Sequence, residues 1–283
     1  MAVTAAMVKE LREMTGAGMM DCKKALAATD GDMDKAVEFL REKGLAGATK
    51  KAGRIAAEGI VMTKVTADEK KAVVVEVNAE TDFVAKNEKF QNYVSDVAEQ
   101  ALNTSAADID AFLAEKWAKD PSLTVAEALS SQISIIGENM KIRRFAQLAE
   151  ENGFVASYIH AGGKIGVLVT FNVEGIDPAS DAFQKCGRDI AMQVAALNPV
   201  SATREDVPAD VAAHEMEIYK AQAAESGKPE AIQEKIALGR MDKFYKENCL
   251  AEQDFVKNPD LTVAQYADEC AKEMGGKIAI TGF

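Results

Sequence analysis

The residue types best suited to nucleophilic or metal chemistry are scarce and scattered in this sequence. It contains two histidines and four cysteines among 283 residues. Structural zinc sites use Cys and His ligands at short spacing, and no C-x-x-C pair occurs here. The cysteines stand far apart, at Cys22, Cys186, Cys249 and Cys270. We therefore expect no bound metal, no cofactor and reduced thiols, as in a cytoplasmic protein.

The two histidines do not indicate a catalytic triad. His214 lies among glutamates and alanines in a helical stretch, where a solvent-exposed side chain is expected. His160 ends a predicted strand, and composition favours a histidine that closes a hairpin. The following run A-G-G-K-I-G (161–166) lacks the G-x-x-x-x-G-K-[ST] pattern of a phosphate-binding loop and joins two strands. The chain is therefore not predicted to be an enzyme.

The stretch A-E-T-D-F-V-A-K-N-E-K-F (79–90) places a large apolar ring beside a carboxylate, between a predicted buried strand and an amphipathic helix. Phe83 lies seven residues before a second phenylalanine, so periodicity favours a Phe83 that begins the apolar stripe, with Thr81 as cap. Alternatively, Asn87 caps a helix that begins at Glu88, and T-D-F-V-A-K is a turn that presents Phe83 to solvent. The residues alone leave both interpretations open.

Composition excludes several classes of function. The net charge is −12 and the pI about 4.8, which argues against a nucleic-acid-binding protein, because binding to phosphates rests on lysine and arginine. Residues 1–54 are mildly basic, with ten Lys/Arg against eight Asp/Glu, so the remainder carries about −14. Apolar runs stay shorter than the roughly 18 residues that span a bilayer, so no membrane association is expected.

The elements that must position these residues begin with three predicted helices in the first 45 residues. Thr4 caps the first helix and Asp32 caps the third, and glycine-containing turns separate them. The predicted apolar face of the first helix consists of Met7, Val8, Leu11 and Met14. The stretch G-L-A-G-A-T-K-K-A-G-R (44–54) that follows is small and basic, and is interpreted as a linker or a loosely held helix.

Beyond this region the chain repeats itself. Strands predicted at 60–66 and 72–78 precede a helix through 88–102, and strands at 154–160 and 166–172 precede a helix through 179–197. A third strand is predicted for each unit, at 141–148 and 277–283. The pattern predicts two related antiparallel sheets covered by helices, which together form an α+β core.

An insert precedes the last strand of each unit. The first, about 103–137, contains Trp117 and is predicted to be helical. The second, about 198–275, contains two helical segments joined by S-G-K-P (226–229), which predicts an antiparallel helical hairpin. The predicted seam of that hairpin consists of Val211, Ile218, Gln222, Ile232, Ile236 and Phe244. A dimer or partner contact through the hairpin is a further expectation.

Several long motifs resemble bacterial elongation factor Ts, the nucleotide exchange factor for elongation factor Tu. The leading motifs are L-R-E-M-T-G-A-G-M-M-D-C-K-K-A-L (11–26) and T-D-F-V-A-K-N (81–87). Further matches are G-E-N-M-K-I-R-R (137–144), S-Y-I-H-A-G-G-K-I-G-V-L-V (157–169) and S-G-K-P-E-A-I-Q-E-K-I-A-L-G-R-M-D-K-F (226–244). They occur in the order expected of the family and span nearly the whole chain.

The resemblance implies a fold and a domain organisation. Expected are a three-helix ubiquitin-associated-like head with its linker (1–54), a core subdomain N (55–149) and a core subdomain C (150–283). The helical hairpin, about 208–248, is inserted in the latter subdomain. Some members of the family carry a further helical module after the last core strand, and its contacts are not transferred to this sequence.

The resemblance also implies a function and its residues. The family's T-D-F-V motif falls on Thr81, Asp82, Phe83 and Val84, and it dislocates the magnesium ion of the partner GTPase so that GDP leaves. Partner-binding residues expected from the head are Met19, Met20 and Lys23, and His160 is expected in the contact region of the core. The competing hypothesis is a non-catalytic adaptor of the ubiquitin-associated type, which would have no use for T-D-F-V.

Overall fold

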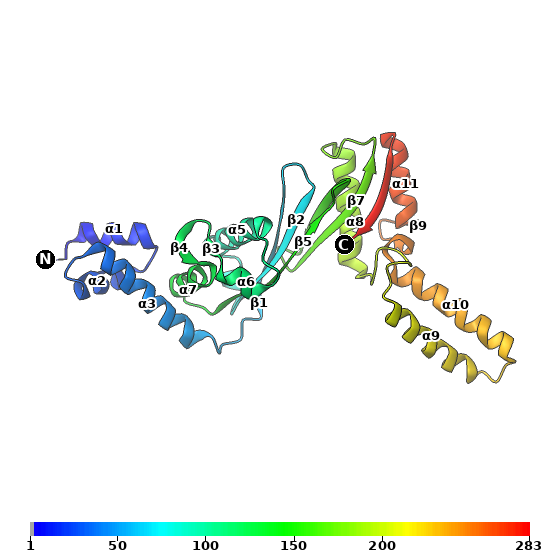
Figure 1. Cartoon of the computed structure of the whole chain (residues 1–283), viewed down its shortest axis with the longest axis horizontal. Helices are drawn as coiled ribbons and strands as arrows, with labels where there is room; N and C mark the ends of the chain where they lie inside the picture. The colour runs from blue at the N-terminus through cyan, green and yellow to red at the C-terminus, as the bar shows by residue number, and fades with distance from the viewer. Residues whose placement is uncertain (1–2) are drawn as a thin grey trace. The chain divides into compact units, whose positions relative to one another are not determined.

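The computed structural model describes residues 3–283 and shows a mixed protein of helices and antiparallel sheets, which confirms the predicted α+β class (Figure 1). Contacts group the chain into two compact units. The first comprises the chain up to Met62, Val74–Ala146 and Gly162–Lys164. The second comprises Thr63–Val73, Gln147–Ala161 and Ile165–Phe283.

Three helices open the described chain, as the glycine and cap positions predict. They are α1 (Ala5–Thr15), α2 (Met19–Ala28) and α3 (Met33–Lys51). The Thr4 hydroxyl accepts a hydrogen bond from the Met7 N–H, and the Asp32 carboxylate accepts one from the Lys35 N–H at 3.1 Å, so both predicted caps are confirmed. Their shared core consists of Val8, Leu11, Cys22, Ala25, Leu26 and Ala36.

The segment interpreted as a linker or a loosely held helix continues α3 as far as Lys51. Gly44 and Ala48 are buried, and α3 packs on α7 (Val125–Ile136). A Cβ atom on Gly44 would lie 3.7 Å from the Ser134 Cβ, so the missing side chain lets the two helices approach closely. A flexible linker over residues 44–51 is therefore wrong. Whether residues 1–54 fold alone stays a prediction.

The first repeat, defined here as residues 58–149, contains a three-stranded sheet of order β1-β2-β5. Its elements are β1 (Glu58–Val65), β2 (Lys71–Ala79), α4 (Asp82–Ala85), α5 (Glu88–Asn103), α6 (Ile109–Ala114), β3 (Lys116–Trp117), β4 (Asp120–Thr124), α7 and β5 (Met140–Ala149). The predicted apolar face of α5 is confirmed, because Phe90, Val94, Val97 and Ala101 are fully buried.

The second repeat, defined here as residues 153–282, contains a sheet of order β10-β7-β6. Its elements are β6 (Gly153–His160), β7 (Ile165–Glu174), α8 (Asp181–Leu197), α9 (Ala209–Ala224), α10 (Glu230–Asn248), the short 3-10 helix η1 (Leu250–Glu252), β8 (Asp254–Phe255), β9 (Asn258–Thr262), α11 (Val263–Met274) and β10 (Lys277–Gly282). β7 pairs antiparallel with β6 from Gly153–Asn172 to His160–Ile165. α8 packs against β6 and β7.

The prediction of a helical first insert is confirmed by α6 and α7 but is wrong at Trp117. Trp117 lies in β3, which pairs antiparallel with β4, and α6 and α7 flank this small hairpin. The second insert contains the equivalent hairpin, β8 with β9, before α11. Strands of two to five residues are too short to show a period-2 pattern, so the sequence pattern does not predict them.

The predicted helical hairpin is formed by α9 and α10, which pack against each other (Figure 1). Ala223, Ala237, Met241 and Phe244 are buried on its inner faces. Ile232, which was predicted to lie in the seam, is instead 44% exposed. In the described part of the chain, helices fall short of the length and apolar character needed to cross a membrane.

Candidate partner-binding surface

The T-D-F-V stretch forms a separate turn between β2 and α5. Residues Asp82–Ala85 make the one-turn helix α4, and the Thr81 hydroxyl caps it by accepting from the Val84 N–H at 3.3 Å. Asn87 caps α5, which begins at Glu88. The interpretation in which Phe83 starts the apolar stripe of α5 is therefore wrong, and the alternative with Asn87 as cap is confirmed.

Phe83 and Val84 point in opposite senses from this turn. The Val84 side chain is buried, whereas Phe83 is 80% exposed. A phenylalanine ring exposed to this degree loses its contribution to folding, since burying such a side chain stabilises a protein by about 1.5–3 kcal/mol. Val84 thus anchors the turn and Phe83 is presented to solvent.

Two carboxylates from different parts of the chain fix the backbone of this turn. Glu138 accepts from the Thr81 N–H at 3.0 Å and from the Thr81 hydroxyl at 2.7 Å. Glu80 accepts from the Asn139 N–H at 2.5 Å. Hydrogen bonds to ionised acceptors are roughly twice as strong as neutral ones. The exposed Phe83 ring therefore stands on a turn held at its base, not on a free loop.

A group of paired charges surrounds the turn. Asp82 contacts Lys86 at 2.7 Å, one helical turn further on. The hydrogen bond from Lys86 lowers the pKa of the Asp82 carboxyl below its usual range, and the charge of Lys164 lowers this pKa further. Lys164 itself pairs with Glu58 at 2.5 Å. Asp82 therefore carries a full negative charge at neutral pH, beside the exposed ring.

The head residues expected to bind a partner form an exposed apolar group at the start of α2. Met19 and Met20 are 59% and 61% exposed, and Lys23 is exposed one turn later. The opposite side of the helix is buried through Cys22 and Leu26. These positions follow from the three-residue and four-residue spacing of the buried side chains.

Met14 extends the exposed methionines of the head. The sequence pattern placed Met14 on the buried face of α1, but it is 60% exposed at the helix end, next to the Gly16 cap. That assignment is wrong because α1 ends one residue after Met14, where the neighbouring helices no longer cover its face. Exposed methionines suit adaptable protein contacts, since the unbranched thioether side chain fits irregular surfaces.

The predicted residues lie in both compact units. Phe83 and the head methionines belong to the first unit, whereas His160 belongs to the second. His160 is exposed at the end of β6, and its Nδ1 lies 2.9 Å from the Tyr158 hydroxyl. This hydrogen bond orients the imidazole. The structure therefore fixes where each residue lies within its own unit, and the role of each in binding stays a prediction.

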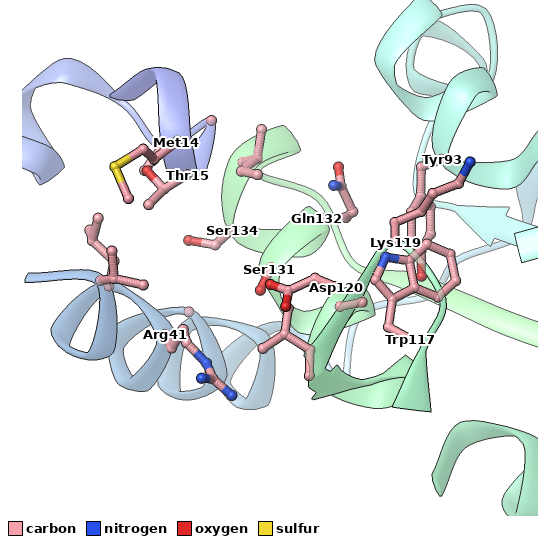
Figure 2. Close-up of a pocket in the computed structure, with 18 of the residues that line it drawn as sticks. Met14, Thr15, Arg41, Tyr93, Trp117, Lys119, Asp120, Ser131, Gln132 and Ser134 are labelled. Carbon is pink, nitrogen blue, oxygen red and sulfur yellow. The ribbon is translucent and has the colours of Figure 1, made fainter. Parts of the chain in front are cut away.

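A hollow of about 560 Å³ lies in the first unit, between the end of α1, α3 and α7. Figure 2 shows Met14 and Thr15 on one side of it, Ser131 and Ser134 on α7, and Tyr93 and Trp117 on the far side. Its charged walls include ion pairs within the protein, which are Lys43 with Asp21 and Lys119 with Asp96. We assign no ligand to this hollow.

Among residues 3–283, no group of three or more His, Cys, Asp and Glu side chains is arranged to hold a metal ion. The thiols of Cys22, Cys186 and Cys249 are buried. Cys270 is less buried, and its pKa is lowered to about 7 by a hydrogen bond from Cys186.

The sequence pattern predicts no role for Glu138 and Asn139, which hold the turn. Both lie within the motif G-E-N-M-K-I-R-R, which carried part of the family resemblance. They hydrogen-bond residues that are 57 and 59 positions away in the chain. Hydrogen bonds between distant segments leave no periodic signal in a single sequence. The motif that contains both residues is the one feature of the sequence that singles out this segment.

Comparisons with known proteins agree with this picture. The sequence model of the family described as Elongation factor TS matches residues 80–282, which include the turn and His160. The chain is 52% identical to "Elongation factor Ts" of Clostridium tetani (strain Massachusetts / E88), over 99% of this chain and 91% of the relative. It is also 52% identical to "Elongation factor Ts" of Trichlorobacter lovleyi, over 100% of this chain and 91% of the relative.

Proposed function

This chain belongs to the elongation factor Ts family of translation elongation factors, and from that premise we propose that it binds elongation factor Tu·GDP and promotes the release of GDP. In this proposal it acts in the cytoplasm, by protein–protein contact, and is not an enzyme that transforms a substrate. Release of GDP leaves the partner free to take up GTP.

One observation carries the proposal: the 80% exposed ring of Phe83 on a turn that Glu138 and Glu80 hold in place. A magnesium ion that bridges phosphates and protein oxygens demands near-ideal octahedral geometry, so a small shift of its surroundings weakens its binding. Phe83 inserts between packed elements of the partner and displaces them. Because the turn is already ordered, little binding energy is lost in fixing it.

The neighbouring residues of the motif have separate tasks in this mechanism. Thr81 and Val84 hold the turn through its cap and its buried side chain. Asp82, ionised at neutral pH, is paired with Lys86 at 2.7 Å, so it helps to orient the turn and adds little net charge beside the inserted ring. Dislocation of the magnesium ion thus follows mainly from the shape of the inserted ring.

Contacts outside the turn supply the binding energy. Met19, Met20 and Lys23 of α2 dock on the partner, and His160 contributes from the second unit. The hairpin of α9 and α10 exposes Ile232 and Leu238, and adds affinity or self-association. Reciprocal coupling requires that GDP weaken the binding of this chain by the same factor by which the chain weakens GDP.

The test is the release of labelled GDP from GDP-loaded elongation factor Tu after the pure chain is added. We expect release to accelerate in a saturable way, and excess GDP to reduce binding of the chain. An adaptor of the ubiquitin-associated type would bind ubiquitin and leave GDP release unchanged, which would refute the proposal.

A further inference from the structure

Ile55 is the second strongly exposed apolar residue of the first unit. It is 84% exposed, against 80% for Phe83, and the other exposed large apolar side chains lie between 37% and 61%. A single exposed apolar residue is ordinary on a protein surface. Ile55 merits an explanation because of where it lies and how its neighbours are held.

Ile55 and Phe83 lie at the same end of the sheet β1-β2-β5. Ile55 precedes β1 by three residues, and Phe83 follows β2 by four. The start of β1 meets the end of β2, because the Asn78 side-chain amide donates to the Glu58 carbonyl at 3.2 Å. Entry into β1 and exit from β2 are thus neighbours in space.

The backbone beside Ile55 is tied to the turn that carries Phe83. The Asn139 side-chain amide donates to the Arg54 carbonyl at 2.7 Å, and the Asn139 N–H donates to Glu80. The Arg54 guanidinium reaches Glu80 at 3.4 Å. Asn139 is itself 9% exposed, so a buried amide connects the two segments.

This arrangement fixes an irregular segment whose exposed side chain contributes nothing to the core. Residues 52–57 form neither helix nor strand, yet the carbonyl of Arg54 is held by a buried side chain. Ordering a segment before binding reduces the entropy lost when a partner arrives. An isoleucine held in this way is suited to enter an apolar recess of another protein.

We propose that Ile55 is a second apolar contact to the same GTPase that receives Phe83, and that it contributes affinity while Phe83 contributes the displacement of magnesium. The inference rests on the proposed function, because it takes the partner of the turn as the partner of Ile55. The partner surface is expected to be apolar where it contacts Ile55. Polar groups around this apolar area are expected to pair with Arg54, Asp82 and Lys86.

The experiment titrates GDP release from GDP-loaded elongation factor Tu with Ile55→Ala, and measures binding by calorimetry in parallel. Removing three carbon atoms from a buried contact should raise the half-saturating concentration about tenfold, while the plateau rate stays within about twofold. Ile55→Val should give a smaller increase, about threefold. Leu197→Ala, which truncates a 48% exposed residue at the end of α8, is the matched control and should leave both values unchanged.

Each outcome is decisive. Because Ile55 is exposed, its variants should keep the circular dichroism spectrum and urea midpoint of the wild type. An unchanged half-saturating concentration and an unchanged calorimetric affinity for both Ile55→Ala and Ile55→Asp would overturn the inference. A change confined to self-association in sedimentation would also overturn it, since the occupant would be a second copy. A wild-type chain that fails to release GDP would refute the proposed function instead, and calorimetry would still test Ile55.

Discussion

The two repeats of this chain share a scaffold, and they differ in the loop after the middle strand and in the helical hairpin α9–α10 that the second repeat carries. Each places a phenylalanine of its first long helix in the core, Phe90 in α5 and Phe183 in α8, 93 positions apart. Each has a glycine within the first two residues of its first strand, pressed against the middle strand. A Cβ on Gly59 would lie 2.2 Å from the Val77 carbonyl oxygen, and a Cβ on Gly153 would lie 1.7 Å from that of Phe171.

A buried glutamine holds the small hairpin in each repeat. Its amide donates to a carbonyl of the first short strand, and its oxygen accepts from an N–H two residues later. The bonds join Gln100 to Lys116 and Ala118, and Gln193 to Asp254 and Val256, at 2.9–3.1 Å. Satisfying these backbone groups matters, because an unpaired buried polar group costs about 1–3 kcal/mol.

The loop after the middle strand separates the repeats. In the second repeat, residues 175–180 lead directly to α8, and Ile176 packs against the core. In the first repeat, the equivalent segment forms α4 and leaves Phe83 exposed. The second repeat shows that this scaffold closes without an exposed aromatic ring. Folding of the scaffold therefore does not require the exposed ring of Phe83, in keeping with the proposed role in binding.

The largest effect should come from the matched core residues. Phe90→Ala and Phe183→Ala each remove a ring from a fully packed site, and each should lower the free energy of unfolding by about 3–5 kcal/mol. Urea unfolding followed by circular dichroism measures both. A loss below about 1 kcal/mol in either repeat would contradict the shared scaffold.

An equivalent Lys–Asp ion pair is present in each repeat, and the two pairs should differ in their contribution to stability. Lys257 contacts Asp189 at 2.6 Å, and the Asp189 side chain is 8% exposed; Lys119 contacts Asp96 at 3.2 Å, and that side chain is 38% exposed. Asp189→Ala leaves the Lys257 cation and the half-buried Tyr266 hydroxyl without their partner, and should cost about 2–3 kcal/mol. Asp96→Ala should cost less than about 1 kcal/mol. Equal losses in urea unfolding would show that burial does not distinguish the pairs.

Two tyrosines, the buried Tyr93 and the half-buried Tyr266, should respond in opposite directions to loss of the hydroxyl. The Tyr93 hydroxyl is buried without a hydrogen-bond partner among the described residues, whereas the Tyr266 hydroxyl donates to Asp189 at 3.0 Å. Tyr93→Phe should raise stability by about 1 kcal/mol, because it removes an unsatisfied group. Tyr266→Phe should lower stability by about 1 kcal/mol. Thermal midpoints of the two variants test this, and a destabilised Tyr93→Phe would reveal a partner.

The smallest effect concerns the charge beside Phe83. Lys86 lowers the pKa of Asp82 through a hydrogen bond, so the stability from this pair is present above the ordinary pKa of aspartate. It is lost as the pH falls through the lowered pKa. Lys86→Ala should raise the pKa of Asp82 towards its ordinary value, and Lys86→Arg should keep it low. Carboxyl chemical shifts in a pH titration measure this, and an unmoved pKa in Lys86→Ala would reject the pairing.

Much of the fold could be predicted from local patterns. Caps at Thr4 and Asp32, the alternating strands and the stripe of α5 are all short-range signals, and they fixed the order of elements. Local alternation does not predict the small hairpins, although the sequence repeats K-D-P-S-L-T-V-A (119–126) as K-N-P-D-L-T-V-A (257–264). This repeat indicates that both inserts contain the same local structure.

The candidate site was predictable in part. The motif T-D-F-V identified the turn, but periodicity pointed towards a buried Phe83, because spacing cannot distinguish a helix start from a capped turn before it. Glu138 and Asn139 form hydrogen bonds with residues more than fifty positions away, and Ile55 is exposed because no other element in the described part of the first unit packs over it. These hydrogen bonds and this exposure depend on tertiary structure, which local sequence patterns do not show.

The ring of Phe83 is expected to contact the partner and not the core of this chain, and the Phe83→Ala variant tests this central claim most directly. Its free energy of unfolding should stay within about 0.5 kcal/mol of the wild type, as for an exposed surface residue. Its plateau rate of GDP release from elongation factor Tu should fall at least about fivefold. A variant that unfolds 3 kcal/mol more easily yet releases GDP at the wild-type rate would contradict the account.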